Sequence, residues 1–187
     1  MNDKMNESSI LLKAKFPGEI IMINQDHEIP DALELLRLEP LIGFDTETRP
    51  AFSKGEVYQV SLLQLATTNH ALLFRLHSLK DFSLLKLFFE NDEIIKVGVA
   101  IRDDIRALQK TFPFEPKGFV ELSEMAKTHN LKNFGLKGMT EEVLKLTLSK
   151  RAKLSNWEMK ELKKDQIIYA ATDAWIGREI YVALKNL

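Results

Sequence analysis

The stretch LIGFDTET, residues 41–48, decides how this 187-residue chain is expected to fold. It is apolar at its start, is bounded by Pro40 and Pro50, and is too short for a helix, so it predicts a β-strand. Asp45 and Glu47 occupy positions i and i+2 of this strand, and such positions point to the same face. The pattern therefore predicts a strand that presents two neighbouring carboxylates at the edge of an apolar core.

The segments on either side of this stretch predict further strands. Residues 19–24 read as a short strand, and the apolar spacing between Pro30 and Pro40 predicts a helix. Residues 57–67 and 71–76 flank a short turn signal, which is typical of a β-hairpin. Together with residues 41–48, the hairpin gives three strands that are expected to lie side by side and to be mainly antiparallel.

In the second half of the chain, strand and helix patterns alternate. Such alternation is typical of a sheet covered by helices. The expected elements are a helix at 81–91, a strand at 94–99, a helix at 102–112, a strand at 119–122, further helices, and a long last helix at about 164–184. We therefore expect an α/β fold, a mixed β-sheet flanked by α-helices, in a single domain over residues 16–187 that follows a flexible tail at residues 1–15.

The composition excludes several classes of protein. With 45% hydrophobic and 28% charged residues, the chain has the make-up of one folded domain. No apolar run reaches the roughly 18 to 20 residues that span a bilayer, and no secretory signal follows the polar N-terminus. Without cysteine, disulfides, thiolate catalysis and cysteine-ligated zinc are excluded. We therefore expect a cytoplasmic protein that has no membrane partner.

The charged residues are unevenly distributed. The formal net charge is −1 and the pI about 6.4, whereas proteins that hold long nucleic acid by charge alone are strongly basic. Any contact with nucleic acid is therefore expected to be local or to use metal cations. A basic stretch between residues 145 and 164 is compatible with an ordinary solvated helical face, and it contains Lys145, Lys150, Arg151, Lys153, Lys160, Lys163 and Lys164.

Two further groups of acids lie where a structural role is only one of the alternatives. Asp103 and Asp104 directly follow a predicted buried strand, at the edge where ligands bind α/β sheets, although either could cap the next helix. Tyr169 and Asp173 are four residues apart on the last predicted helix and share a face. Asp165 shares that face as well, and a structural salt bridge is the alternative for Asp173.

Taken together, these acids favour a metal site. Asp45 and Glu47 repel each other and lose solvation, which is costly unless a cation compensates, although the strand could also simply end in water. Four acids from a strand, a strand–helix junction and a terminal helix can converge on two metal ions. Oxygen ligands favour Mg²⁺ or Mn²⁺, and two such ions roughly 3.5–4 Å apart suit in-line attack on a phosphodiester.

Three segments of the chain resemble, in order, the exonuclease motifs of the DEDD superfamily. They are FDTET at 44–48, VGVAIRDDIRAL at 97–108 and YAATDAWIGREIY at 169–181. The tyrosine four residues before the last aspartate is similar to the DEDDy branch. The loop TRPAFSKGE at 48–56 looks more like the Werner-syndrome exonuclease-domain group than ribonuclease D. The resemblance covers about residues 18–184.

This resemblance implies a ribonuclease H-like fold and a 3′→5′ exonuclease that uses two Mg²⁺ or Mn²⁺ ions. It implies release of nucleoside 5′-monophosphates from DNA or RNA 3′ ends, with DNA slightly favoured, and leaves the oligomeric state open. The implied metal ligands are Asp45, Glu47, Asp104 and Asp173, and Tyr169 is implied beside the attacking water. Substrate contacts are expected from Thr46, Gln64, Lys150, Arg151, Lys153 and Trp157.

Two alternatives to these assignments remain open. Trp157 could stack on a base, but it could instead anchor its helix to the core. A catalytically silent nucleic-acid-binding or scaffold module on the same fold is the other functional hypothesis.

Overall fold

A six-stranded mixed sheet forms the centre of the computed structural model, which describes residues 11–149 and 154–187. The strands lie in the order β2 (Glu19–Ile23), β5 (His70–Arg75), β4 (Val60–Ala66), β3 (Leu41–Thr48), β6 (Ile95–Gly98) and β7 (Phe119–Glu121). β4 pairs antiparallel with both β3 and β5. β2 pairs parallel with β5, and β6 and β7 continue in parallel beyond β3. The predicted mixed sheet is confirmed.

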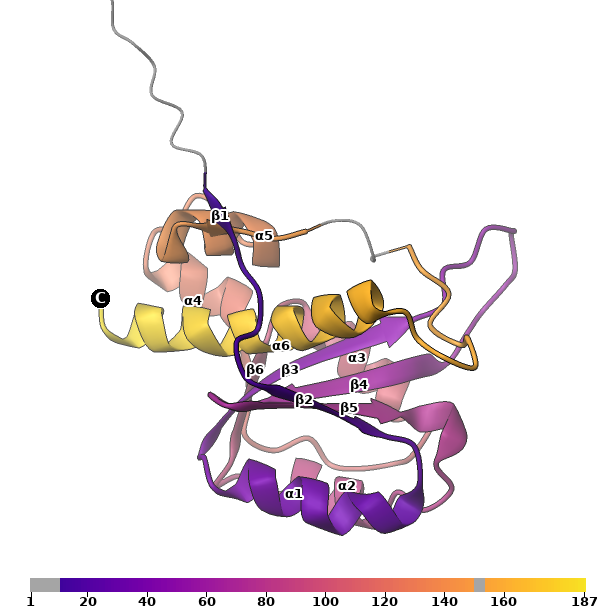
Figure 1. Ribbon diagram of the computed structural model, residues 1–187. Coiled ribbons are helices and arrows are strands. Elements are labelled where there is room, and N and C mark those ends of the chain that lie inside the picture. Colours follow the sequence, from indigo (N-terminus) through magenta and orange to yellow (C-terminus); the bar gives the residue numbers. More distant parts are fainter. Residues whose placement is uncertain (1–10, 150–153) are drawn as a thin grey trace, which may run out of the picture.

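Helices cover both faces of this sheet (Figure 1). α1 (Ile29–Arg37), α2 (Ser83–Phe89) and α3 (Ile101–Leu108) contribute to one apolar layer. α6 (Lys164–Lys185) crosses the other face, and α4 (Leu122–Thr128) and α5 (Leu136–Met139) pack against it. Short 3₁₀ turns occur at Asp26–Glu28 and Leu76–Ser78, and a π-helical turn at Thr140–Leu144. None of the helices in the described ranges combines the length and the apolar character that crossing a bilayer requires.

Strand β4 separates the two apolar layers because its side chains alternate between the faces of the sheet. Leu63 and Leu65 belong to the layer covered by α1, α2 and α3. Leu62 and Ala66 belong to the layer under α6, where they meet Ala170, Ala171 and Ala174. These small helix residues let α6 lie close to the sheet, and Gln64 points into the same layer.

Residues near the N-terminus join a second, two-stranded sheet. β1 (Leu12–Lys13) pairs in parallel with β8 (Leu146–Thr147). The next segment contacts α6, since the backbone N–H of the buried Phe16 donates to Oγ1 of Thr172 at 3.1 Å. Of the predicted tail 1–15, the first ten residues lie outside the described ranges, and β1 is held against the folded chain. The boundary of the domain stays a prediction.

Some observed elements are shorter than their predicted counterparts. The helix predicted at 102–112 ends at Leu108 in the structure, and a turn follows it before Pro113. The strand predicted at 57–67 begins only at Val60. The pairing register of β3 with β4 shifts between Glu47 and Thr48, and Thr48 then pairs with Val60, the first residue of β4.

Lys96 is an unusual member of the core, because its side chain is fully buried on β6. Its Nζ donates to the carbonyl oxygen of Asn91 at 2.6 Å and lies 5.7 and 5.1 Å from the ring centres of Phe88 and Phe119. Burial lowers the pKa of Lys96 to about 8, although the charge of Asp92 acts in the opposite direction. The ammonium group is therefore held in the core at a cost to stability.

We expect the substitution Lys96→Met to stabilise the fold at neutral pH. The pKa of Lys96 is lower in the folded than in the unfolded chain, so the full penalty applies below pH 8 and the folded protein gains stability as pH rises from about 8 to 10.5. Lys96→Met should raise the free energy of unfolding by about 1–3 kcal/mol at pH 7, with a smaller gain at pH 9.5. Urea unfolding at both pH values measures this; a less stable variant at pH 7 would contradict it.

Candidate active site

Strand β3 presents Asp45 and Glu47 to the face of the sheet that α6 covers. They lie directly opposite Gln64 and Leu62 of β4 in the antiparallel ladder. Opposed residues of such a ladder share a face, and Leu62 packs into the layer under α6. Both acidic side chains are half-buried. The period of the strand thus places the two carboxylates on one face of the sheet, beneath the last helix.

Gly43 lets α6 come close to this strand. A Cβ atom at Gly43 would lie 1.9 Å from the carbonyl oxygen of Ala174 and 2.8 Å from its carbonyl carbon. Real Cβ atoms do not approach backbone that closely, so any side chain here would push the helix away. The residue next to Ala174 is Asp173, and its distance from Asp45 and Glu47 therefore depends on the missing side chain of Gly43.

The close approach of α6 gathers three of the four predicted carboxylates. Single oxygen atoms from Asp45, Glu47 and Asp173 all lie within 4.8 Å of one another, and the side chain of Asp173 is buried. Three negative charges at this separation repel one another strongly away from bulk water. Oxygen-only donors fit a hard divalent cation such as Mg²⁺ or Mn²⁺. This donor set therefore suits the metal that the sequence motifs imply.

Asp104 approaches β3 from the side of α3 and is not one of the three gathered carboxylates. Its Oδ1 accepts a hydrogen bond from Oγ1 of Thr46 at 2.6 Å, and Thr46 lies between Asp45 and Glu47. Burial raises the pKa of Asp104, the hydrogen bond from Thr46 lowers it, and the charge of Asp103 adds to the rise. Asp104 is thus hydrogen-bonded to the strand that carries the cluster. A nearby cation would favour the ionised form of Asp104.

Asp103 plays a different part from its neighbour. Its side chain is 90% exposed, and its Oδ1 lies 3.5 Å from Arg106 in a surface ion pair one turn along the helix. The two adjacent aspartates therefore point in different directions. The choice of Asp104 over Asp103 as the inward residue, which only the resemblance suggested, agrees with this geometry.

Glu121, at the end of β7, was missed by the sequence reasoning. Its carboxylate accepts hydrogen bonds from the backbone N–H groups of Ala100 and Ile101, both at 2.9 Å. These groups begin α3, so Glu121 anchors the junction from which Asp104 projects. Ala100 itself has a positive φ of 60°, a conformation that turns the chain sharply from β6 into α3. An acid ending the strand next to β6 was the available signal.

Tyr169 lies one turn before Asp173 on α6, and its hydroxyl donates a hydrogen bond to that carboxylate. Burial raises the pKa of Tyr169 well above its usual value, and the negative charges of Asp173 and Glu47 raise it further. The phenol therefore stays protonated at neutral pH in the ion-free protein. It can orient a water molecule by hydrogen bonding, but it is a poor acceptor of a proton.

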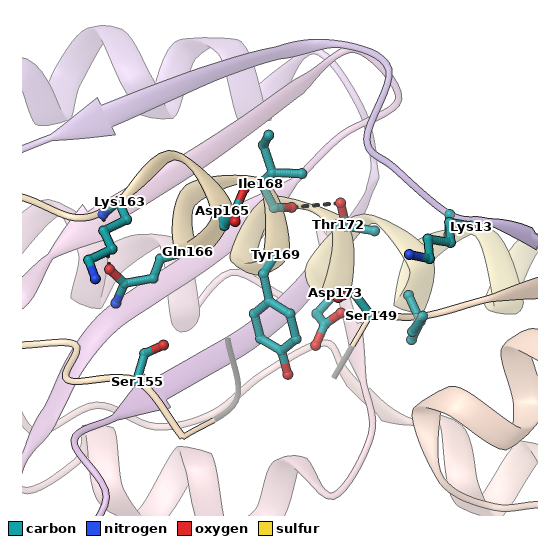
Figure 2. A pocket seen from close by; sticks show the side chains of 12 residues that line it. Lys13, Ser149, Ser155, Lys163, Asp165, Gln166, Ile168, Tyr169, Thr172 and Asp173 are labelled. Atoms are coloured by element: carbon teal, nitrogen blue, oxygen red, sulfur yellow. Dashed lines mark hydrogen bonds between the residues drawn. The ribbon is translucent and has the colours of Figure 1, made fainter. Parts of the chain in front are cut away.

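Two adjoining pockets meet at these residues. The larger, of about 680 Å³, contains Asp45, Thr46 and Glu47 together with the 135–138 segment. The smaller, of about 340 Å³, is lined by the first turns of α6 and by β1, with Lys13 and Lys163 in its wall (Figure 2). Both pockets share Leu148, Ser149, Tyr169 and Asp173. The carboxylate cluster thus lies between two cavities.

The predicted substrate contacts fall in different places. Thr46 lines the larger pocket, although its hydroxyl is engaged with Asp104. Gln64 is fully buried beneath the site. Lys150, Arg151 and Lys153 lie outside the described residues, so their contacts stay a prediction.

Trp157 is fully buried in the apolar layer under α6. Its ring centre lies 6.2 Å from that of Tyr169. The segment around it is fastened from two sides, because the buried Arg75 of β5 donates to the carbonyl oxygen of Lys160 at 2.6 Å and Arg49 pairs with Glu158 at 3.1 Å. Trp157 therefore anchors its segment to the core, and this burial leaves no face of the indole for stacking on a base.

The geometry of this site has counterparts among known proteins. A family model described as 3′-5′ exonuclease matches residues 20–187. The chain belongs to the 3′-5′ exonuclease family. It is 34% identical over 186 residues to the mouse (Mus musculus) bifunctional 3′-5′ exonuclease/ATP-dependent helicase WRN, covering 92% of this chain and 13% of that protein. The exonuclease chain described here thus corresponds to a small part of that relative.

Solved structures place the exonuclease on a known fold. The EXO domain of Aedes aegypti Nibbler superposes with a TM-score of 0.82 at 23% identity, covering 95% of this chain and 92% of that chain. Escherichia coli RNase D, described as an exoribonuclease involved in structured RNA processing, superposes with a TM-score of 0.77 at 25% identity, covering 88% and 45%. The predicted ribonuclease H-like fold and the DEDDy-type exonuclease family are both confirmed.

Proposed function

We propose that this exonuclease removes nucleotides one at a time from the 3′ end of a nucleic-acid strand, using two Mg²⁺ or Mn²⁺ ions, and releases nucleoside 5′-monophosphates. The observation that carries the proposal is the meeting of Asp45, Glu47 and Asp173 within 4.8 Å, beside a pocket of about 680 Å³. Family membership supports the same activity.

Each carboxylate has a separate part in this proposal. Asp45, Glu47 and Asp173 would hold the first cation, and Asp104, which is hydrogen-bonded to Thr46, would contribute to the second. Bound divalent cations lower the pKa of water and neutralise the charge that develops on the leaving oxygen. No arginine or lysine is needed for that neutralisation, which is consistent with the net charge of −1.

Tyr169 would orient the attacking water in this mechanism. Its hydroxyl stays protonated at neutral pH, because burial and the neighbouring acids raise its pKa. Its one proton is donated to Asp173, so its oxygen can accept a hydrogen bond from the water and hold it in line with the scissile bond. It lines both pockets and would therefore lie next to a nucleotide held in either of them.

Lysine side chains line both pockets and can contact the phosphate backbone of a bound strand. Lys137 lines the larger pocket, and Lys13 and Lys163 line the smaller one. We propose that the terminal nucleotide enters the larger pocket, beside the carboxylates, and that the adjacent phosphates lie against lysines. Contacts of this kind hold a single strand without reading its sequence.

Shortening of end-labelled strands tests the proposal. With a 5′ label and Mg²⁺ or Mn²⁺, we expect a ladder of products that shorten from the 3′ end, and no shortening after chelation with EDTA. Nucleoside 5′-monophosphates should accumulate in proportion to the number of nucleotides removed from the strand. Parallel reactions on single-stranded DNA, recessed duplex DNA and RNA measure whether DNA is slightly favoured over RNA, as we expect from the sequence. Binding of these strands with Mn²⁺ present, without any shortening, would instead identify a silent binding module.

A further inference from the structure

The side chain of Gln64, in the middle of β4, is buried and has no hydrogen-bond partner within residues 11–149 and 154–187. It is 0% exposed, and neither its Nε2 nor its Oε1 atom makes a hydrogen bond to any described residue. Withdrawing an amide from water without new hydrogen bonds is unfavourable for folding. The stability of the ion-free fold therefore does not explain why a polar side chain occupies this position.

The register of the sheet places this amide under the metal-binding carboxylates. Gln64 is directly opposite Asp45, and opposed residues of an antiparallel pair have Cβ atoms about 4.5–5.5 Å apart on the same face. Glu47 is its diagonal neighbour on that face. The other diagonal neighbour is Gly43, which has no side chain. The polar partners that β3 offers to Gln64 are therefore Asp45 and Glu47.

Apolar residues flank Gln64 along β4 and lie directly opposite it on β5, where its diagonal neighbour on the same face is the buried Arg75. Leu62 and Ala66 lie two residues to either side of it on β4, and Leu73 is its partner on β5. These three residues pack with the alanines of α6 in the same buried layer. Competition from water is therefore weak, and a hydrogen bond formed by this amide with a carboxylate is correspondingly strong.

We propose that Gln64 is a positioning residue whose side-chain N–H donates to the Asp45 carboxylate when the site holds its divalent cations. A carboxylate that binds a cation through one oxygen retains acceptor capacity, and a donor placed there fixes the orientation of the ligand. The inference rests on the proposed function and adds a member of β4 to a site otherwise built from β3, α3 and α6.

The structure also contains a competing, purely structural partner. Nε1 of Trp157 is buried without a hydrogen-bond partner among the described residues and belongs to the same apolar layer. A trapped water that joined Trp157 to Gln64 would satisfy both groups without involving the metal site. The two possibilities differ in one measurable property, the affinity of the protein for a divalent cation.

Gln64→Met tests the proposal because it removes both polar atoms and keeps the length of the side chain. Titration with Mn²⁺, followed by the EPR signal of the free ion, should show binding about tenfold weaker than in the wild type. The melting temperature in EDTA should stay the same or rise by about 3 °C, since a buried unpartnered amide is gone. Gln64→Leu, measured in the same way, is the second variant if Gln64→Met does not fold.

Thr111→Val is the matched control. The Oγ1 atom of Thr111 is likewise buried and unpartnered among the described residues, but it lies beyond the end of α3, next to Phe112, which belongs to the layer on the other side of the sheet. We expect Thr111→Val to keep the wild-type Mn²⁺ affinity. The proposal is overturned if Gln64→Met binds Mn²⁺ within twofold of the wild type, or if both variants lose affinity equally.

The same titration separates this inference from the proposed function. A wild-type protein that binds Mn²⁺ but never shortens a strand would refute the exonuclease function and leave the comparison of Gln64→Met with the wild type valid. A wild-type protein that shortens strands, with Gln64→Met binding Mn²⁺ equally well, would refute the role of Gln64 alone. A wild-type protein without Mn²⁺ affinity would refute both.

Discussion

The substitution Asp45→Asn is expected to slow 3′-end shortening by about 10³-fold or more. A bound cation supplies several kcal/mol of transition-state stabilisation, and each 1.4 kcal/mol is about a factor of ten in rate. Asn has almost the same shape as Asp but lacks the negative charge that holds a cation. The loss should therefore come with weaker Mn²⁺ binding, measured by titration beside the rate on a 5′-labelled strand.

Folding should not suffer from this substitution. Asp45, Glu47 and Asp173 repel one another in the ion-free protein, because their oxygens lie within 4.8 Å. Removing one charge relieves that repulsion, so the melting temperature in EDTA should be unchanged or higher. Asp103→Asn is the matched control: it makes the same change of charge on a side chain that is 90% exposed and paired with Arg106. Full activity of Asp45→Asn would remove these carboxylates from the mechanism.

Gly43→Ala is expected to have the largest effect on the geometry of the site. Its Cβ would lie 1.9 Å from the carbonyl oxygen of Ala174, so α6 must move away from β3. Forcing atoms into a packed interface of this kind destabilises a protein by about 2–4 kcal/mol. The shift would also carry Asp173 away from Asp45, and Mn²⁺ affinity and strand shortening should fall together. Urea unfolding and Mn²⁺ titration measure the two effects.

Gly177→Ala is the comparison for this variant. Gly177 is on α6 and faces β6, where a new Cβ would meet its nearest atom, the carbonyl oxygen of Val97, at an ordinary 3.6 Å. Alanine also favours helix over glycine, so the free energy of unfolding should rise by about 0.5–1 kcal/mol. If Gly43→Ala is as stable as Gly177→Ala, the close approach of α6 to β3 does not depend on the glycine.

Periodicity explains which parts of the site could be predicted from the sequence. Asp45 and Glu47 share a face because a strand repeats every two residues, and Tyr169 and Asp173 share a face because a helix repeats about every four. Each of these pairs lies within one element, so the two residues share a face however the elements pack against one another. The order of the predicted strands and helices along the chain likewise indicated a mixed sheet covered by helices.

The features that could not be predicted depend on packing between distant segments. Asp103 and Asp104 both occupy the first turn of α3, and only the contact of Asp104 with Thr46 separates their roles. Glu121 reaches the start of α3 because β7 lies beside β6. Trp157 was named as a substrate contact, whereas its burial depends on how one loop folds under α6. Such contacts have no periodic signature.

The placement of α6 also affects how the enzyme is made. During synthesis, β3 leaves the ribosome more than a hundred residues before Asp173. A polypeptide halted before Lys164 would carry Asp45 and Glu47 but lack the helix that completes the cluster, and it would expose the apolar side chains of Leu62, Ala66 and Leu73. Exposed apolar surface of this kind promotes aggregation and capture by chaperones. Incomplete translation products are therefore expected to lack the carboxylate cluster and to aggregate more readily than the complete chain.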